Sequence, residues 1–481
     1  MSTANPEHAF PEKGRSRDEV LAALMDHKSR DLVSDGRAFA FVYDAGASVR
    51  ELAREAYAAC MPINGLDPTV YPSARKIENA VVAACLEITS APEGACGTAT
   101  AGGTESVMLA VKSARDYARK TRPEITQPKM LLPVTAHACF HKAAAYLGVE
   151  VVSVGVDPTS FRADVADAER KMSEDVILVV GSAPSYAHGV VDPIEGLAKL
   201  ARESGALMHV DACVGGCVLP FMRMNGESVP QFDFSVPGVT SLSMDLHKYG
   251  FAPKGVSVLL QRRRELRDAQ YFACAKWTGY TIVNSTTLGS KSVSAMGAAF
   301  ALLHHLGKEG YRERAARMWS ATKHLVSVVR ETPGLRMLGA PDMNLFAFTT
   351  EGGDVFELAD RLTERGWHVQ PTYAFGPSPA HIHLTLDPGN SERAPDFGRD
   401  LRECMQGLPA SQEPPAQVVQ LLESIGLGGG EALDSGMLMQ QLGISDGQLP
   451  SRSAIIHRLI NAASPAARER LLVLFIGELF S

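Results

Sequence analysis

A lysine in an unusual local context, Lys248, is the residue of this chain that most clearly suggests covalent chemistry. It lies in the stretch 241–250, between two β-prone runs at 238–244 and 255–260, which predicts a hairpin. Most lysines are hydrated surface charges, and this is the plain alternative. A lysine held inside a pocket can instead lose its proton by desolvation and attack an aldehyde to form a Schiff base.

Two motifs upstream of Lys248 carry groups that suit a phosphate and a ring nitrogen. The segment Ala101-Gly-Gly-Thr-Glu-Ser106 precedes a helical pattern, so its glycine backbone and the helix N-terminus can bind a phosphate. The alternative is a plain turn in which Thr104 caps the helix. Asp211 follows an apolar run at the predicted carboxyl end of a strand, where α/β proteins bind their ligands. Its alternatives are a helix cap and a surface carboxylate.

A third motif, Thr-Ala-His-Ala, contains His137, whose ring could cover the face of an aromatic cofactor. A lone histidine is more often a capping or core residue. An aldehyde-binding lysine, a phosphate-binding turn, a carboxylate for a ring nitrogen and a stacking histidine are together the parts that pyridoxal phosphate needs. The sequence has no Gly-x-Gly-x-x-Gly after a first strand and no Gly-Lys-Ser/Thr loop, which disfavours dinucleotide and nucleoside-triphosphate sites.

The elements that must position these residues alternate between apolar runs and amphipathic helices. We expect helices over 72–88, 104–120, 138–147 and 194–204, and strands over 129–133, 150–154, 177–181 and 207–210. This alternation predicts an α/β fold with a mostly parallel sheet and helices on both faces. After a long apolar helix (295–306), the strand-like segments 343–349 and 381–386 surround a helix over 355–364. This change of pattern predicts a smaller α+β domain.

We therefore expect four regions. They are an N-terminal arm with helices (1–60), a large cofactor-binding domain (61–305), a small α+β domain (306–408), and a linker with a C-terminal helical extension (409–481). The chain of 481 residues is long enough for such a division.

Composition narrows the function classes. The net charge is −7 without a long basic run, which argues against nucleic acid as a partner. The longest apolar stretches are too short to span a membrane, and the polar N-terminus does not have the pattern of a secretory signal. Eight scattered cysteines without a Cys-x-x-Cys pair favour a reduced, cytoplasmic protein without a metal site.

Several longer segments carry a resemblance to a known family. They are Tyr71-Pro-Ser-Ala-Arg-Lys-Ile-Glu78, Gly102-Gly-Thr-Glu-Ser106, Val134-Thr-Ala-His-Ala-Cys-Phe-His-Lys-Ala-Ala144, Gly181-Ser-Ala-Pro-Ser-Tyr-Ala-His-Gly-Val-Val-Asp-Pro193, His209-Val-Asp-Ala-Cys-Val-Gly-Gly216, Gly238-Val-Thr-Ser-Leu-Ser243 and His247-Lys-Tyr-Gly-Phe-Ala-Pro-Lys-Gly255. The chain resembles the pyridoxal-phosphate lyases and decarboxylases of fold type I, and among them the sphingosine 1-phosphate lyases. The resemblance spans roughly residues 38 to 405 and is loose beyond them.

The resemblance implies roles for individual residues of the cofactor half of the site. It makes Lys248 the Schiff-base lysine, Asp211 the partner of the pyridine nitrogen, and His137 a catalytic residue that stacks on the ring. The residues that it implies for the cofactor phosphate are Gly103, Thr104 and His247, with Gly289 and Ser290 supplied by the second subunit of a homodimer with shared active sites.

The resemblance also implies a catalytic tyrosine and a substrate half of the site. Tyr249 matches a tyrosine that assists proton transfer, and the residues that match substrate positions are Tyr43, Asn64 and Lys254. A fourth position departs from the family. The lyases have Asn-Pro-Leu-His where this chain has Asn64-Gly-Leu-Asp67, so a phosphate-binding histidine is replaced by a carboxylate that would repel a phosphate. The alternative is that Asp67 caps a turn and points away.

Two further motifs depart from the family pattern. Gly-Ser-Arg-Pro-Gly is here Gly289-Ser-Lys-Ser-Val293, and Trp-x-Gly-Gly is Trp277-Thr-Gly-Tyr280. We therefore expect weak or no cleavage of sphingosine 1-phosphate, with a gain in phosphate affinity on Asp67→His.

The resulting function hypothesis is a pyridoxal-phosphate-dependent carbon–carbon lyase acting on a small-molecule amine. The resemblance implies retro-aldol cleavage of an amino alcohol through an external aldimine, with release of an aldehyde. The alternative is an amino-acid decarboxylase on a non-phosphorylated substrate. A third hypothesis, a catalytically silent binding subunit, is disfavoured because Lys248, Asp211 and His137 are all present.

Overall fold

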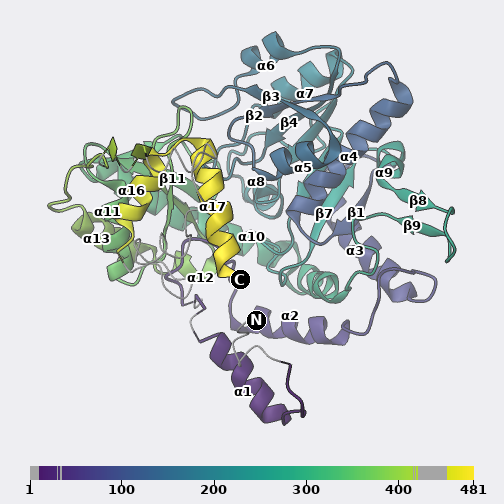
Figure 1. The fold of residues 1–481 in the computed structure, drawn as a ribbon, viewed down its shortest axis with the longest axis horizontal. Coiled ribbons are helices and arrows are strands. Elements are labelled where there is room, and N and C mark those ends of the chain that lie inside the picture. The colour runs from purple at the N-terminus through teal and green to yellow at the C-terminus, as the bar shows by residue number, and fades with distance from the viewer. Residues whose placement is uncertain are drawn as a thin grey trace.

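A seven-stranded sheet, here called the large sheet, forms the centre of the computed structural model (Figure 1). The structure describes residues 10–29, 31–32, 35–414, 416–417, 419–420 and 452–480. In spatial order the strands are β1 (Cys96–Thr100), β7 (Ser257–Gln261), β6 (Ser241–Met244), β5 (Leu207–Asp211), β4 (Val176–Ser182), β2 (Lys129–Pro133) and β3 (Glu150–Val154). Strands β3, β2, β4, β5 and β6 run parallel, and β7 is antiparallel to both β6 and β1. The predicted mostly parallel α/β sheet is confirmed.

Helices cover both faces of the large sheet. They are α3 (Pro72–Ile88), α4 (Gly103–Thr121), α5 (Cys139–Leu147), α6 (Val165–Lys171), α7 (Ile194–Glu203), α8 (Leu219–Met224) after a short 3-10 turn (Gly215–Cys217), and α9 (Arg264–Gln270). Strand β2 shows the division: Met130 and Leu132 pack with the α4 and α5 side, whereas Leu131 packs with the α7 side. Successive side chains of a strand point to opposite faces, so a strand covered on both sides is apolar throughout.

A second, four-stranded antiparallel sheet, here called the small sheet, lies beside the large one (Figure 1). Its order is β10 (Leu335–Leu338), β11 (Leu345–Thr350), β13 (His381–Thr385) and β12 (Gln370–Thr372). The helices of this part are α11 (Val355–Glu364), α12 (Pro388–Ser391), α13 (Ala394–Cys404), α16 (Ala454–Ala462) and α17 (Pro465–Leu479). The large and small sheets fall inside the expected ranges 61–305 and 306–408, while the boundaries of those domains stay a prediction.

The helix α10 (Ser294–Glu331) connects the two sheets. The predicted helix over 295–306 is its first part. The helix continues to Glu331 across a non-helical residue, Gly307, whose φ of 54° suits glycine. The N-terminal arm also reaches the small sheet, because the amide of Phe39 donates to the carbonyl of His368 at 2.8 Å and its carbonyl accepts from Thr385 at 2.7 Å. The arm is therefore hydrogen-bonded to the small sheet at Phe39, and the predicted division at residue 60 stays a prediction.

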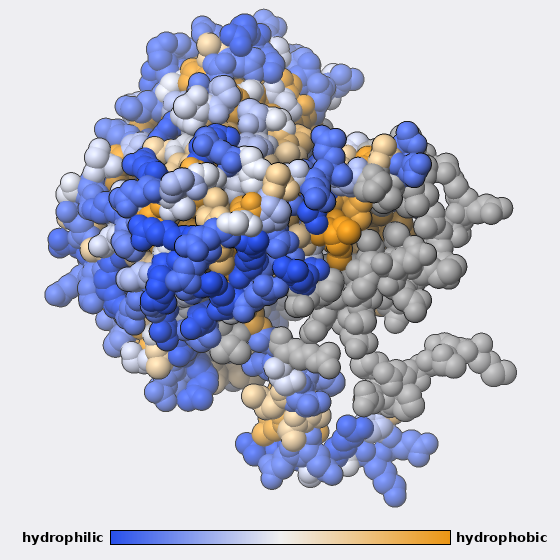
Figure 2. Space-filling view, turned by 90° about the vertical axis from the view of Figure 1, so that its left-hand side faces the viewer, coloured by the Kyte–Doolittle hydropathy of each residue, from blue (hydrophilic) through white to orange (hydrophobic). Residues whose placement is uncertain are grey.

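Two elements project from the body with apolar side chains. Helix α1 (Arg17–His27) has no buried residue and extends below α2 (Ala47–Ala59) in Figure 1. In Figure 2 an apolar patch shows at the bottom of the molecule, over this helix. Its exposed apolar residues include Val20, Leu21, Leu24 and Met25. The hairpin of β8 (Phe272–Cys274) and β9 (Ile282–Asn284) also projects, and Phe272, Trp277, Tyr280 and Val283 on it are exposed. Among the described helices, none is long and apolar enough to cross a membrane.

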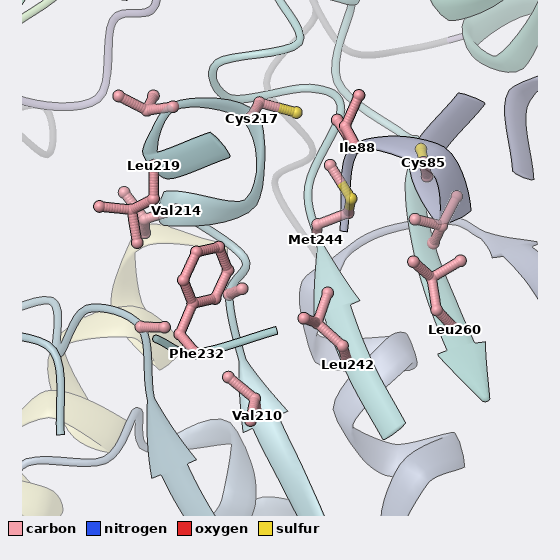
Figure 3. Packing of buried hydrophobic residues seen from close by; sticks show 14 of the residues in the cluster. Cys85, Ile88, Val210, Val214, Cys217, Leu219, Phe232, Leu242, Met244 and Leu260 are labelled. Atoms are coloured by element: carbon pink, nitrogen blue, oxygen red, sulfur yellow. The ribbon is translucent and has the colours of Figure 1, made fainter. Parts of the chain in front are cut away.

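The core beneath the site is packed from several elements, as Figure 3 shows for one cluster. Met244 and Leu242 of β6 lie between Val210 of β5 and Leu260 of β7, with Cys85 of helix α3 nearby (Figure 3). All five are buried hydrophobic residues. This packing holds the ends of β5 and β6 rigidly, and the residues that follow these strands form the site described next.

Candidate active site

A cavity of about 550 Å³ opens at the carboxyl ends of the parallel strands. It brings together six residues predicted from the sequence, namely Gly103, Thr104, His137, Asp211, His247 and Lys248. They come from the last residue of β5 and from the segments that follow β1, β2 and β6. Ligands of α/β sheets bind at this edge because the carboxyl ends of parallel strands meet there.

Lys248 lies in the connection between β6 and β7, as the predicted hairpin requires, and its amine is 3.0 Å from a carboxylate oxygen of Asp245. Burial alone lowers the pKa of Lys248, but Asp245, aided by Cys213 and Tyr43, raises it above its ordinary value. The expected loss of the proton by desolvation is therefore wrong for this arrangement. The lysine is held as an ammonium because a buried carboxylate outweighs the cost of burial.

Asp245 is the functional candidate that reasoning from sequence missed. Its side chain is 2% exposed and also lies 3.6 Å from Nε2 of His247. A Cβ built on Gly103 would lie 2.7 Å from Asp245 Oδ2, so only glycine fits beside the carboxylate. The available signal was its position three residues before Lys248, in Met244-Asp-Leu-His-Lys248.

Asp211 ends β5 and is 8% exposed. Burial alone raises the pKa of Asp211, but hydrogen bonds from Cys213 and the charge of Lys248 outweigh it and lower the pKa. The amide of Cys213 donates to Asp211 Oδ1 at 3.0 Å, and the hydroxyl of Ser243 donates to the same oxygen at 3.4 Å. Asp211 is thus kept as a carboxylate, the form that can pair with a protonated ring nitrogen.

A fully buried histidine, His209, supports Asp211 from behind. Its Nε2 is 3.2 Å from the hydroxyl of Ser243, and its Nδ1 is 2.9 Å from the hydroxyl of Ser241. Burial lowers the pKa of His209 to about 4, although the charge of Asp211 opposes this shift. The imidazole is therefore neutral at pH 7, and it joins Asp211 through Ser243 in one hydrogen-bonded chain.

His137 and the start of α4 complete the cavity wall. His137 is exposed to the cavity, and its Nδ1 accepts a hydrogen bond from the amide of Cys139 at 3.2 Å, which orients the ring. Helix α4 begins at Gly103 with Gly102 as its N-cap, so the alternative in which Thr104 caps the helix does not hold. The N-terminus of α4 faces the cavity and offers its first-turn amides to an anion.

These groups fit pyridoxal phosphate. Lys248 matches the aldehyde, Asp211 the pyridine nitrogen, and His137 the ring face. The N-terminus of α4 with Gly103 and Thr104 matches the phosphate, and the volume of the cavity is within the range of cofactor sites. Among the described residues there is no cluster of three or more metal-ligating side chains.

The position of Tyr249 does not match the catalytic role that the resemblance implies. Its side chain is fully buried, and its hydroxyl donates to the carbonyl of Leu386 at 2.7 Å. Burial also raises the pKa of Tyr249. Tyr186 lines the cavity instead, and its hydroxyl donates to Gln370 of β12 at 2.8 Å. The geometry therefore does not support proton transfer by Tyr249. Tyr186, from the motif at 181–193, is the better-placed tyrosine for that role.

Two of the predicted substrate residues, Tyr43 and Lys254, lie side by side. The amine of Lys254 is 4.5 Å from the centre of the Tyr43 ring and donates to the carbonyl of His247 at 3.1 Å. Burial raises the pKa of Tyr43 to about 12. Lys254 also lines a second cavity of about 190 Å³, together with Lys291.

The other two substrate residues, Asn64 and Asp67, face their own turns. The side chain of Asn64 accepts from the amide of Leu66 at 3.0 Å. Asp67 is exposed and accepts from the amide of Thr69 at 2.8 Å and from its hydroxyl at 2.6 Å. These hydrogen bonds lower the pKa of Asp67. Neither residue is part of the lining described for the Lys248 cavity, and the bonds of Asp67 match the turn-capping alternative rather than a role toward substrate.

Gly289 and Ser290 are exposed in the segment that follows β9. A Cβ on Gly289 would meet no atom within 4 Å, and neither residue lines the Lys248 cavity of its own chain. Their contact with a cofactor phosphate across a subunit boundary stays a prediction.

Known proteins resemble this chain over most of its length. A family model described as pyridoxal-dependent decarboxylase conserved domain matches residues 7–351, and a second, described as pyridoxal-dependent enzyme, C-terminal putative HTH domain, matches residues 436–478. A sphingosine-1-phosphate lyase of Arabidopsis thaliana is 39% identical over 446 residues, which cover 91% of this chain and 80% of the relative. A probable L-aspartate decarboxylase of Pyrococcus furiosus is 33% identical over 361 residues, covering 75% of this chain and 94% of the relative.

A solved structure is also similar. The sphingosine-1-phosphate lyase of Burkholderia pseudomallei has a TM-score of 0.80 and 33% identity, with coverage of 83% of this chain and 93% of the other.

Proposed function

Because the chain belongs to the pyridoxal-dependent decarboxylase family and is a lyase that uses pyridoxal phosphate, we propose that it cleaves the bond between the amine-bearing carbon and the hydroxyl-bearing carbon of an amino alcohol. The observation that carries this proposal is one cavity that unites Lys248, Asp211 and His137 in a chain 33–39% identical to proteins named sphingosine-1-phosphate lyase. An aldehyde and a smaller amine are the products of such a cleavage.

The protein supplies the binding and orientation that this chemistry requires. When bound, pyridoxal phosphate supplies an aldehyde for attachment to an amine and a ring that accepts the electron pair released at the substrate. Asp211, kept ionised by its hydrogen bonds, would hold a proton at the ring nitrogen and so keep the ring electron-poor. His137 would cover one face of the ring, and the first turn of α4 would hold the phosphate.

Asp245 has a defined role in moving protons at Lys248. The ammonium of Lys248 must lose a proton before the amine can bond to a carbonyl carbon. Asp245 lies 3.0 Å away to accept this proton, and its second oxygen, Oδ1, has no partner among the described residues. When its amine is not bonded to the cofactor, Lys248 would be a base inside the cavity. Asp245 would stabilise the ammonium that forms when Lys248 takes a proton from the substrate hydroxyl.

Decarboxylation is the second candidate function, because the family model and the Pyrococcus furiosus relative both carry that name. It uses the same cofactor groups and differs in the bond that breaks. A panel of amino alcohols, phosphorylated and not, and of amino acids distinguishes the two, with aldehyde and carbon dioxide assayed separately. We expect aldehyde release. Carbon dioxide release from an amino acid without aldehyde from any amino alcohol would establish the decarboxylase instead.

We further propose that the working form is a cytoplasmic homodimer. The exposed apolar residues of α1 and of the β8–β9 hairpin support an interface, since soluble monomers rarely expose contiguous apolar patches. The exposed Gly289 and Ser290 support shared active sites, because neither lines the Lys248 cavity of its own chain. Sedimentation velocity of the full chain tests the assembly, and a species of single-chain mass at micromolar concentration would contradict it.

A further inference from the structure

A buried carboxylate, Glu105, joins two loops that are far apart in sequence. It lies in the first turn of α4 and is 9% exposed. One of its oxygens accepts from the amide of Ala101 at 2.6 Å. The other accepts from the amide of Thr287 at 2.8 Å and, more closely, from the hydroxyl of Thr287. Such charge-assisted hydrogen bonds are about twice as strong as neutral ones.

One loop lies at the cofactor cavity, and the other carries Gly289 and Ser290, which are proposed to reach the site of the second subunit. Ala101 directly precedes Gly102 and the phosphate-binding start of α4. Thr287 lies two residues before Gly289 in the exposed loop that follows β9. Glu105 lines both the Lys248 cavity and the smaller cavity that contains Lys254 and Lys291, so it forms part of the wall between them.

The loop that follows β9 has further anchors on its other side. The carbonyl of Lys291 accepts from the amide of Gly65 at 2.8 Å, and its amine lies 3.3 Å from Glu78. Thr286 donates to the carbonyl of Leu288 at 3.1 Å within the loop. The side chain of Gln270 donates to the carbonyl of Ser285 at the start of the loop. Glu105 is an anchor on the side of the cofactor cavity, and it holds Thr287, two residues before Gly289.

We propose that Glu105 is a positioning residue that couples the two active sites of the dimer. Through Ala101 it holds the phosphate loop of its own subunit, and through Thr287 it holds the loop that reaches the phosphate of the other subunit. This inference rests on the proposed function and on the shared sites proposed with it. A change at Glu105 should then weaken cofactor binding in both sites, including the one whose own Glu105 is intact.

Glu105→Gln tests the local part of this proposal. A glutamine has one acceptor oxygen and one donor group, so either Ala101 or Thr287 would face an NH₂ group instead of an acceptor. We expect pyridoxal phosphate to bind about tenfold more weakly to the cofactor-free variant. Binding is followed by the visible absorption of the lysine-bound cofactor, and the thermal unfolding midpoint of the cofactor-free protein is measured alongside. Native affinity in Glu105→Gln would overturn the proposal.

Variants of Thr287 separate the effect of its hydrogen bond to Glu105 from the effect of packing. They also test the proposal if Glu105→Gln does not fold. Thr287→Ser keeps the hydroxyl and should bind the cofactor like the native chain. Thr287→Val keeps the shape and loses the hydroxyl, and it should bind several-fold more weakly. The Glu105→Gln, Thr287→Val double variant should lose less than the sum of the two, because both substitutions remove one interaction. Equal affinity of the Ser and Val variants would overturn the role of this contact.

Mixed dimers test the coupling across the boundary. One chain is native, and its partner carries Lys248→Ala either alone or with Glu105→Gln, so only the native chain gives the lysine-bound absorption. We expect the native site to bind the cofactor several-fold more weakly beside the double variant. Equal affinity beside both partners would overturn the coupling. A native homodimer without the visible band would instead overturn the proposed function, and the inference with it.

Discussion

The amine of Lys248 lies 3.0 Å from a carboxylate oxygen of Asp245, and both groups line the cavity that also contains Asp211. The lysine thus shares its cavity with two buried carboxylates, Asp245 in direct contact and Asp211 elsewhere in the lining. This arrangement keeps an amine charged in a place where burial alone would neutralise it, so that its proton is delivered and removed at a defined position.

The Lys248–Asp245 pair should stabilise the cofactor-free protein. A lysine with a raised pKa contributes stability that is fully present below the ordinary lysine pKa and is lost as the pH rises through the raised value. We expect Asp245→Asn to lower the free energy of unfolding by about 1 to 3 kcal/mol at pH 7 and by less at strongly alkaline pH. Urea unfolding at both pH values measures this. The Lys248→Ala, Asp245→Asn double variant is the control, and strict additivity of the two changes would show that the pair is not coupled.

Asp211→Asn should leave the fold intact and reduce turnover by about 10- to 100-fold, because a neutral amide cannot hold the ring proton by charge. Cofactor affinity should fall as well. Ser243→Ala is a matched control that removes only the 3.4 Å hydrogen bond to Asp211, and its effect should be smaller. Steady-state kinetics and cofactor titration of both variants provide the comparison. Near-native turnover of Asp211→Asn would mean that Asp211 does not face the ring nitrogen.

Removing the hydroxyl of Tyr249 should affect mainly stability, whereas removing that of Tyr186 should affect mainly turnover. Tyr249→Phe loses a buried hydrogen bond to Leu386, so we expect a loss of about 1 kcal/mol in the free energy of unfolding with little change in kcat. Tyr186→Phe changes a side chain that lines the cavity, and we expect it to lower kcat by about tenfold or more. Unfolding and kinetics of both variants decide between them. A larger kcat loss in Tyr249→Phe would restore the catalytic role expected from the sequence.

Substitution of Asp67 should have little effect on substrate affinity, because its carboxylate faces its own turn. Its carboxylate is bound to Thr69, so Asp67→His should leave the KM for a phosphorylated amino alcohol unchanged and lower the thermal midpoint slightly. The lowered pKa of Asp67 means that its contribution to stability is present above the ordinary carboxyl pKa and is lost as the pH falls through the lowered value. Asp67→Asn is the control for charge alone. A clear drop in KM in Asp67→His only would revive the hypothesis that this position selects against phosphate.

Much of the fold was predictable from local patterns. The strands β2 and β3 and the helices α3 and α11 begin and end at the residues that the sequence pattern indicates. Each is a continuous apolar run or a helical pattern with clear ends, so the short-range signal is strong. The residues of the cofactor cavity were also visible, because His137, Asp211 and Lys248 each follow a predicted strand or β-prone run at the same edge of the sheet. The phosphate-binding glycines were visible from their place ahead of a predicted helix.

Only the tertiary structure decided which groups these residues meet. Glu105 and Thr287 are 182 positions apart, and the contact of Tyr249 with Leu386 spans 137. Asp67 turns toward Thr69 because a nearby amide and hydroxyl satisfy its carboxylate at once. The charge of Lys248 depends on how closely Asp245 approaches within the folded loop, and the sequence alone does not contain that distance. Residue types therefore indicate the chemistry of this chain, whereas proton positions and couplings follow from long-range packing.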